Sequence, residues 1–135
     1  MRDVHILFID DDEDFLYLLE RACEFCGDIK EISSASNGAE AISLLQQWLS
    51  FKSKLPQVIC VDINMPIMNG FEFIEAFEKL KNENKDLENI VLISFLTSSN
   101  NSEDREKALA HKNVHYLTKP VDFEDLQNLV LEMVA

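Results

Sequence analysis

Five consecutive acidic residues, Asp10 to Asp14, follow directly on the apolar run Val4–Ile9. Like charges a few ångströms apart repel by roughly 3–4 kcal/mol per pair at an effective dielectric constant near 20, so such a cluster is costly unless a cation neutralises it. Asp62 ends a second apolar run, and Thr97 and Lys119 end two others. Carboxylates, a hydroxyl and an ammonium at the ends of apolar runs are the groups here whose types and spacing could do chemistry.

Asp10, Asp11 and Asp62 offer hard oxygen donors, and Mg²⁺ is the natural ion for a few carboxylates together with waters and often a phosphate. A lysine such as Lys119 would be misplaced at a site that only binds a cation. It is useful where a phosphoryl group also binds and brings its own negative charge. An aspartate can then act as the nucleophile that forms an acyl phosphate. Metal and lysine neutralise the charge on the group in transfer. These residue types therefore indicate Mg²⁺-assisted phosphoryl chemistry.

The elements that must position these groups alternate regularly along the chain. Apolar runs of strand length predict strands at 4–9, 29–35, 57–63, 90–96 and 114–118, and segments of helical period begin near 14, 38, 70, 102 and 122. Strand and helix in alternation, five times over, predict a doubly wound (βα)5 fold with a parallel sheet and right-handed crossovers. Sites in such sheets form at the carboxyl ends of the strands, where the acids, Thr97 and Lys119 lie.

The helix ends and faces give further expectations. Asp12 is interpreted as a charge at the start of the first helix, and Asp122 as the N-cap of the last. The first helix is expected to turn five residues inward: Phe15, Leu18, Leu19, Ala22 and Cys26.

Cys23 and Cys26 form a C-x-x-C pair, a spacing also found at redox and zinc sites. No second pair of Cys or His at ligand spacing follows, so we interpret both as helix residues. The three histidines, His5, His111 and His115, are scattered and are interpreted as structural or surface residues.

Composition excludes several partners. The chain has 135 residues, enough for one domain with a core, and its net charge of −13 argues against DNA, RNA or an anionic membrane. Its apolar runs are far shorter than the ~20 residues that cross a bilayer. The N-terminal run lacks a small-residue cleavage site, so a cytoplasmic setting is expected.

Four motifs carry a family resemblance: "ILFIDDD", "VDINMPIMNGFEF", "FLTSSNN" and "YLTKPVD". In this order and spacing the sequence resembles the receiver domain of two-component response regulators, from about residue 4 to 133. The resemblance implies a flavodoxin-like, CheY-like fold with strand order 2-1-3-4-5. The expectation is one receiver domain over residues 1–135, with no output domain, since the chain ends just after the last helix.

The resemblance also implies roles for the acids. Asp62 is the expected phosphoacceptor. Asp10 and Asp11 form the acidic pair that holds Mg²⁺ together with Asp62, and Asn64 supplies its backbone carbonyl to the metal. Asn64 and Ser99, each two residues beyond a site residue, are expected to tune hydrolysis of the phosphoryl group.

On the other two strand ends, Thr97 is expected to hydrogen-bond one phosphoryl oxygen and Lys119 to pair with another. Tyr116 is the expected aromatic switch, turning inward when Thr97 moves. A cis bond is expected before Pro120. Gly70 is expected to let the loop after Asp62 turn tightly into the third helix.

The leading functional hypothesis is a signalling switch. A histidine kinase or histidine phosphotransfer protein would phosphorylate Asp62, which changes the surface of the fourth helix, fifth strand and fifth helix for a downstream target protein. The loop "LSFKSKLPQ" is longer than usual and "AHKNVHY" replaces a common Gly-Ala pair, so dimerisation through that surface, and the oligomeric state, stay open.

Three alternatives compete with this hypothesis. A Mg²⁺-dependent phosphatase of the haloacid-dehalogenase type would attack with a first-strand Asp, but the cap and late acidic pair of that family are absent. A pseudo-receiver would keep the fold as a binding module without chemistry. An EF-hand would need Gly and Glu where Phe15 and Arg21 stand.

Overall fold

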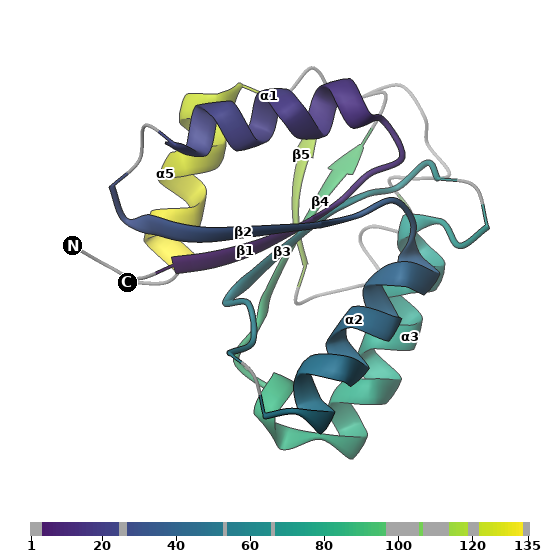
Figure 1. The fold of residues 1–135 in the computed structure, drawn as a ribbon. Coiled ribbons are helices and arrows are strands. Elements are labelled where there is room, and N and C mark those ends of the chain that lie inside the picture. The colour runs from purple at the N-terminus through teal and green to yellow at the C-terminus, as the bar shows by residue number, and fades with distance from the viewer. Residues whose placement is uncertain are drawn as a thin grey trace.

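The computed structural model describes residues 4–24, 27–52, 54–65, 67–96, 106, 114–118 and 122–133. Five parallel strands form one sheet in the predicted order 2-1-3-4-5 (Figure 1). Across the sheet these are β2 (Ile29–Ala35), β1 (Val4–Ile9), β3 (Val58–Asp62), β4 (Val91–Leu96) and β5 (Val114–Thr118). The α/β doubly wound fold expected from the alternating pattern is therefore confirmed.

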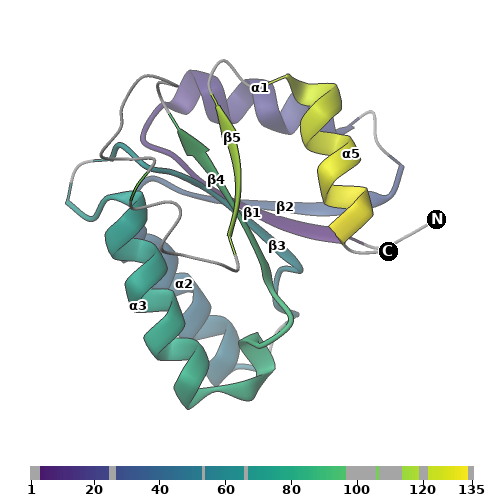
Figure 2. The same cartoon turned by 180° about the vertical axis from the view of Figure 1, so that it is seen from behind.

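Helices cover both faces of the sheet. The two views show α1 and α5 on one face and α2 and α3 on the other (Figures 1 and 2). Their bounds are α1 (Glu13–Glu24), α2 (Gly38–Ser50), α3 (Gly70–Glu83) and α5 (Phe123–Met133), with a short 3-10 helix, η1 (Lys85–Leu87), after α3. The helix predicted from residue 102 falls almost wholly outside the described residues. No helix in the described ranges is long and apolar enough to cross a bilayer.

The central strands β1 and β3 are buried along their whole length, because helices cover them on both sides. Alternate side chains of β1 enter opposite cores. Ile6 and Phe8 pack with α1 and α5, whereas Leu7 and Ile9 pack with α2 and α3. The period of two along each strand thus supplies both cores.

Side-chain caps fix where the helices begin. Asp12 Oδ1 accepts hydrogen bonds from the backbone N–H groups of Asp14 and Phe15, at 3.0 and 3.2 Å. Asp122 caps α5 in the same way, and Asn69 caps α3 in a capping box with Glu72. Each such cap stabilises its helix by about 1 kcal/mol. The predicted starts at Asp12 and Asp122 are confirmed.

The predicted inward face of α1 is wrong at one position. Leu18 is 52% exposed, whereas Leu19 and Cys23 are buried and Leu16 packs against the same core. The buried stripe runs through 16, 19 and 23, and Leu18 lies about 100° around the helix from Leu19, outside it. Cys23 is a helix residue, as interpreted, and it lies in the core, while Cys26 lies outside the described residues.

The amino end of β1 holds a buried histidine. His5 is 1% exposed, and its Nε2 lies 2.9 Å from Ser33 Oγ on β2. Trp48 of α2 packs edge-on against the imidazole, with 5.4 Å between ring centroids. Burial lowers the pKa of His5, and the neighbouring Glu31 carboxylate partly opposes this. His5 is therefore a structural residue, as the sequence indicated, but its place in the core could not be read from the sequence.

Candidate phosphoacceptor site

The register of two strands brings two aspartates together. In the parallel pair β1–β3, Ile9 lies opposite Val61, and the next residues along the chain are Asp10 and Asp62. Both carboxylates are buried, at 1% and 3% exposure. Asp10 and Asp62, which are 52 residues apart in the sequence, therefore lie close together at one edge of the sheet.

Asp11 completes an acidic pocket, the name used below for Asp10, Asp11 and Asp62. One carboxylate oxygen from each residue lies within 4.8 Å of the others. Asp11 is exposed, so the pocket opens to solvent on its side. At this spacing the buried pair Asp10 and Asp62 repel by about 3 kcal/mol at an effective dielectric constant of 20. Three oxygen donors so close together fit a small divalent cation such as Mg²⁺, which prefers carboxylates and water.

Backbone N–H groups orient the two buried carboxylates. Asp10 Oδ1 accepts from the N–H of Asp12 at 2.9 Å, and Asp62 Oδ1 accepts from the N–H of Asn64 at 3.1 Å. In both cases the donor lies two residues further along the chain, the local arrangement that aspartate favours at turns. Each carboxylate is therefore held by a backbone N–H group of its own loop.

Gly70 lets α3 begin against the strand that carries Asp62. A Cβ at this position would lie 2.6 Å from Asp62 O and 2.7 Å from Ile63 Cα, both backbone atoms. The Gly70 N–H also donates to Ile63 O at 2.9 Å. No glycine among the described residues has a positive φ, so close approach of two backbones, rather than a left-handed turn, is what requires glycine here.

The loop between β3 and α3 is anchored on both sides of an exposed residue. Met65 is buried in the core, and Met68 packs over Gly38 of α2. Between them Ile67 has φ +68° and is 82% exposed. A β-branched residue in the left-handed region is a conformational outlier. Sequence reasoning missed Ile67, because nothing in its residue type signals this backbone.

Tyr116 of β5 packs against Ile63 and Phe71, on the loop and helix that follow Asp62. Its hydroxyl is buried, with no hydrogen-bond partner among the described residues. Burial raises the pKa of the Tyr116 hydroxyl, and the Glu78 carboxylate raises it further. The expected switch residue is thus in contact with the segment after the expected phosphoacceptor.

Four residues singled out from the sequence, Thr97, Ser99, Lys119 and Pro120, lie outside the described residues. Their roles stay predictions. The structure brings together Asp10, Asp11, Asp62 and the backbone of Asn64. As a chemical assembly, this group can hold a divalent cation beside a buried, oriented carboxylate.

Comparison with known proteins gives the family. The pattern that defines the response regulator receiver domain matches residues 6–131. A 14.6 kDa protein of Leptolyngbya boryana is 37% identical over 96% of this chain and 89% of its own length. The transcriptional regulatory protein PrrA of Mycobacterium tuberculosis is 31% identical over 90% of this chain, which spans only 46% of that regulator.

Solved structures agree on the fold. A two-component response regulator from Cytophaga hutchinsonii matches with a TM-score of 0.77 and 31% identity, over 99% of this chain and 98% of that one. The receiver domain of Saccharomyces cerevisiae Ssk1, crystallised with the phosphotransfer protein Ypd1, matches with a TM-score of 0.80 over 98% of this chain and 89% of that one, at 21% identity. These matches favour the receiver interpretation over the phosphatase alternative. The chain belongs to the response regulator receiver domain family of two-component and phosphorelay systems.

Proposed function

We propose that this protein is a phosphorylation-dependent switch whose phosphoacceptor is Asp62. An oxygen of the Asp62 carboxylate attacks the phosphorus of a phospho-histidine on a partner protein. The new P–O bond forms as the P–N bond breaks, and the electron pair of the broken bond stays on the imidazole nitrogen. The product is an acyl phosphate on Asp62 and a dephosphorylated histidine on the partner.

The single observation that carries this proposal is the acidic pocket at the ends of β1 and β3. Asp10, Asp11, Asp62 and the backbone carbonyl of Asn64 would hold Mg²⁺. The metal, when bound, supplies positive charge next to the oxygens of the transferring group. The N–H of Asn64 keeps one oxygen of Asp62 in place, which limits the orientations that the nucleophile must search.

The remaining roles rest on the resemblance of the motifs. Thr97 and Lys119 would bind two phosphoryl oxygens, and Tyr116 would follow Thr97 to report phosphorylation. The contacts of Tyr116 with Ile63 and Phe71 support this assignment, because they join β5 to the loop that leaves Asp62. Phosphorylation would then shift a population between two states of the surface around β5 and α5, for a downstream protein target.

A histidine kinase or a histidine phosphotransfer protein is the proposed donor. The related Ssk1 receiver was crystallised with such a phosphotransfer protein. For this chain the partner contact is a proposal, supported by exposed apolar side chains on the two segments that follow the acidic residues: Tyr17 and Leu18 on α1 and Ile67 on the loop after β3.

The test is incubation with acetyl phosphate and Mg²⁺, followed by intact mass. We expect one added phosphoryl group that is lost in base, and no addition with Asp62→Asn or with chelator. Asp11→Asn should slow labelling strongly while leaving the fold intact, because Asp11 is exposed. Labelling of Asp62→Asn at the wild-type rate, or labelling that survives chelation unchanged, would overturn the assignment.

A further inference from the structure

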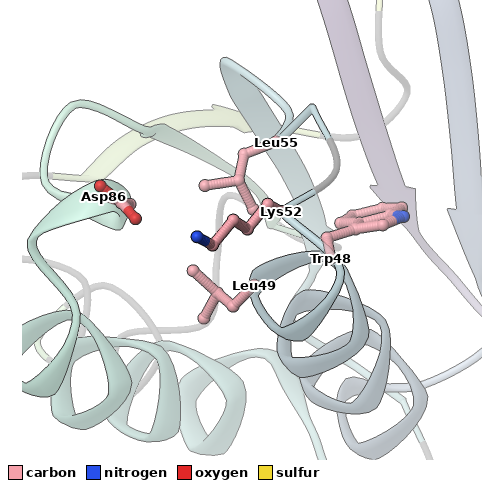
Figure 3. Close-up of a pocket in the computed structure, with 5 residues that line it drawn as sticks. All are labelled: Trp48, Leu49, Lys52, Leu55 and Asp86. Carbon is pink, nitrogen blue, oxygen red and sulfur yellow. The ribbon is translucent and has the colours of Figure 1, made fainter.

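A cavity of about 490 Å³ lies at the amino-terminal edge of the sheet, opposite the acidic pocket. It is formed by the end of α2, the loop that leads to β3, and η1 (Figure 3). We call it the basal cavity; its lining residues are Trp48, Leu49, Lys52, Leu55 and Asp86. Its volume falls in the range of roughly 300–1,000 Å³ that is typical of small-molecule sites. Nothing in the proposed phosphoryl chemistry uses this region.

Two opposite charges face the basal cavity over an apolar wall. Figure 3 shows the Lys52 ammonium group directed across the cavity toward the side that holds Asp86, between Leu49 and Leu55. Within the described ranges, Lys52 and Asp86 form no ion pair with each other or with another side chain. A charged group on a ligand could therefore pair with each of them without first breaking an ion pair.

The backbone at Lys52 is held in an uncommon conformation. Its φ is +53°, and its N–H donates to Leu49 O at 3.3 Å as α2 ends. Glycine or asparagine usually takes this left-handed position at a helix end. Lys52 and Leu55 both belong to the loop between α2 and β3, so this loop supplies the cation and part of the apolar wall of the cavity.

A smaller hollow of about 190 Å³ adjoins the basal cavity and shares Leu55 and Asp86 with its lining. Its other lining residues are Pro56, Gln57, Asn89 and Ile90, so it adds apolar surface and two amide side chains. Amide groups can hydrogen-bond a peptide unit in either direction, as donor or acceptor. The volume of the basal cavity alone exceeds that of a single amino acid, so a ligand with a peptide bond can be accommodated.

We propose that the basal cavity binds a small apolar zwitterion of dipeptide size. The ligand carboxylate would pair with Lys52 and its ammonium with Asp86. The apolar side chains would pack on Trp48, Leu49 and Leu55. The two charges of the site select against ligands with one charge only, because each would leave one partner unmatched or repelled.

Three probes test the charge requirement: L-leucyl-L-leucine, its N-acetyl derivative and its C-terminal amide. Trp48 is the only tryptophan of the chain and lines the cavity, so its fluorescence reports occupancy. Chemical-shift mapping of the full chain gives an independent readout. We expect millimolar binding of the dipeptide, and about threefold to fivefold weaker binding when either charge is blocked.

Variants test which side chains bind the charged groups of the ligand. Lys52→Met should remove the preference for the free carboxylate, and Asp86→Asn the preference for the free ammonium. The double variant Lys52→Asp, Asp86→Lys should recover zwitterion binding. Lys85→Met is the matched control, since Lys85 lies on η1 but does not line the basal cavity. No saturable binding of the dipeptide, or equal binding of all three probes by the wild type, would overturn the proposal, and neither result bears on phosphorylation of Asp62.

Discussion

Buried polar groups differ between the carboxyl edge of the sheet, where the strands end, and the amino edge, where the strands begin. At the carboxyl edge, Asp10 and Asp62 are both buried, with carboxylate oxygens within 4.8 Å of each other. At the amino edge, His5 is equally buried, but its Nε2 bonds Ser33, its Nδ1 faces the Glu31 carboxylate at 3.7 Å, and its backbone pairs with Gln57. Its ring also packs on Trp48.

These contacts indicate a different role for each edge. A buried polar group that is hydrogen-bonded and uncharged costs little and fixes the packing around it. Two buried carboxylates cost stability until a cation or a chemical change neutralises them. We therefore expect the amino edge to be structural around β1, and the carboxyl edge to gain stability when a cation binds between Asp10 and Asp62.

The largest expected effect is steric and lies at the carboxyl edge. Gly70→Ala places a methyl group 2.6 Å from Asp62 O, a backbone atom that cannot move without shifting the strand end. We expect a loss of about 2–3 kcal/mol in the free energy of unfolding, measured in urea. Phosphorylation of Asp62 should fall as well, because its carboxylate moves with the strand.

Gly38→Ala is the matched control for this change. Its Cβ would meet the Met68 side chain, Cγ at 2.8 Å and Sδ at 2.9 Å, which can rotate away, and one backbone atom, Met68 O, at the longer distance of 3.1 Å, where a shift of a few tenths of an ångström suffices. The expected loss is about 1 kcal/mol or less. Equal losses for the two glycines would show that the strand end is no more rigid than a methionine side chain.

The second prediction concerns stored repulsion. Asp62→Asn removes one of the two buried charges, so we expect the free energy of unfolding in chelator to rise by about 1–2 kcal/mol. Mg²⁺ should stabilise the wild type and have a much smaller effect on the variant. The measurement is urea unfolding with chelator and with Mg²⁺ for each protein.

Asp14→Asn serves as the control, because Asp14 is exposed in the first turn of α1. There an acid is favoured by the helix dipole, so its loss should lower stability by a few tenths of a kcal/mol. A decrease in stability for Asp62→Asn in chelator would contradict the view that the carboxyl edge stores repulsion.

The features of the fold and the site that could be predicted from the sequence are those set by residues close together along the chain. Strand and helix positions follow from the hydrophobic period. Because sites in parallel sheets form at the carboxyl ends of the strands, the sequence also predicts Asp10 beside Asp62. The cap at Asp12 was readable for the same reason, since it acts within three residues.

Other features depend on contacts between distant segments and could not be predicted from the sequence. His5 meets Ser33 and Trp48 only after the sheet and α2 have assembled. The exposure of Leu18 depends on how α1 is rotated against the sheet. The basal cavity needs the end of α2 and η1 side by side, some 35 residues apart along the chain.

The third prediction tests the amino edge with pH. Burial is the main cause of the lowered pKa of His5; the Glu31 carboxylate and the backbone of Leu55 and Lys54 oppose it, whereas the charge of Lys54 adds to it. Because the folded-state pKa lies below the ordinary 6.5, the unfolded chain binds the proton more readily. His5 thus stabilises the fold fully above pH 6.5, and this contribution is lost as pH falls toward the folded pKa.

His5→Gln should flatten the fall in the free energy of unfolding between pH 7.5 and 5.5, a slope that one histidine limits to about 1.4 kcal/mol per pH unit. The variant will also be less stable overall, so the slope and not the absolute value is the readout. His115→Gln, at an exposed position of β5, is the control and should keep the wild-type slope. A slope unchanged by His5→Gln would remove His5 from the account of the amino edge.

The smallest effect on stability should come from Ile67, where the carboxyl edge carries strain rather than charge. Asparagine tolerates the left-handed region better than isoleucine, so Ile67→Asn should raise the free energy of unfolding by about 0.5–1 kcal/mol. The same variant removes an exposed apolar side chain beside the acidic pocket. Phosphotransfer from a protein donor should therefore slow severalfold, while labelling by acetyl phosphate stays at the wild-type rate.

Ile67→Ala separates the two effects, because alanine removes the apolar surface but keeps a Cβ in the left-handed backbone. It should slow protein phosphotransfer as Ile67→Asn does, without the gain in stability. If both variants are phosphorylated by the protein donor as fast as the wild type, the strain at Ile67 serves only the local fold of the loop. If acetyl phosphate labelling also falls, the loop instead positions Asp62, and the partner surface must lie elsewhere on the carboxyl edge.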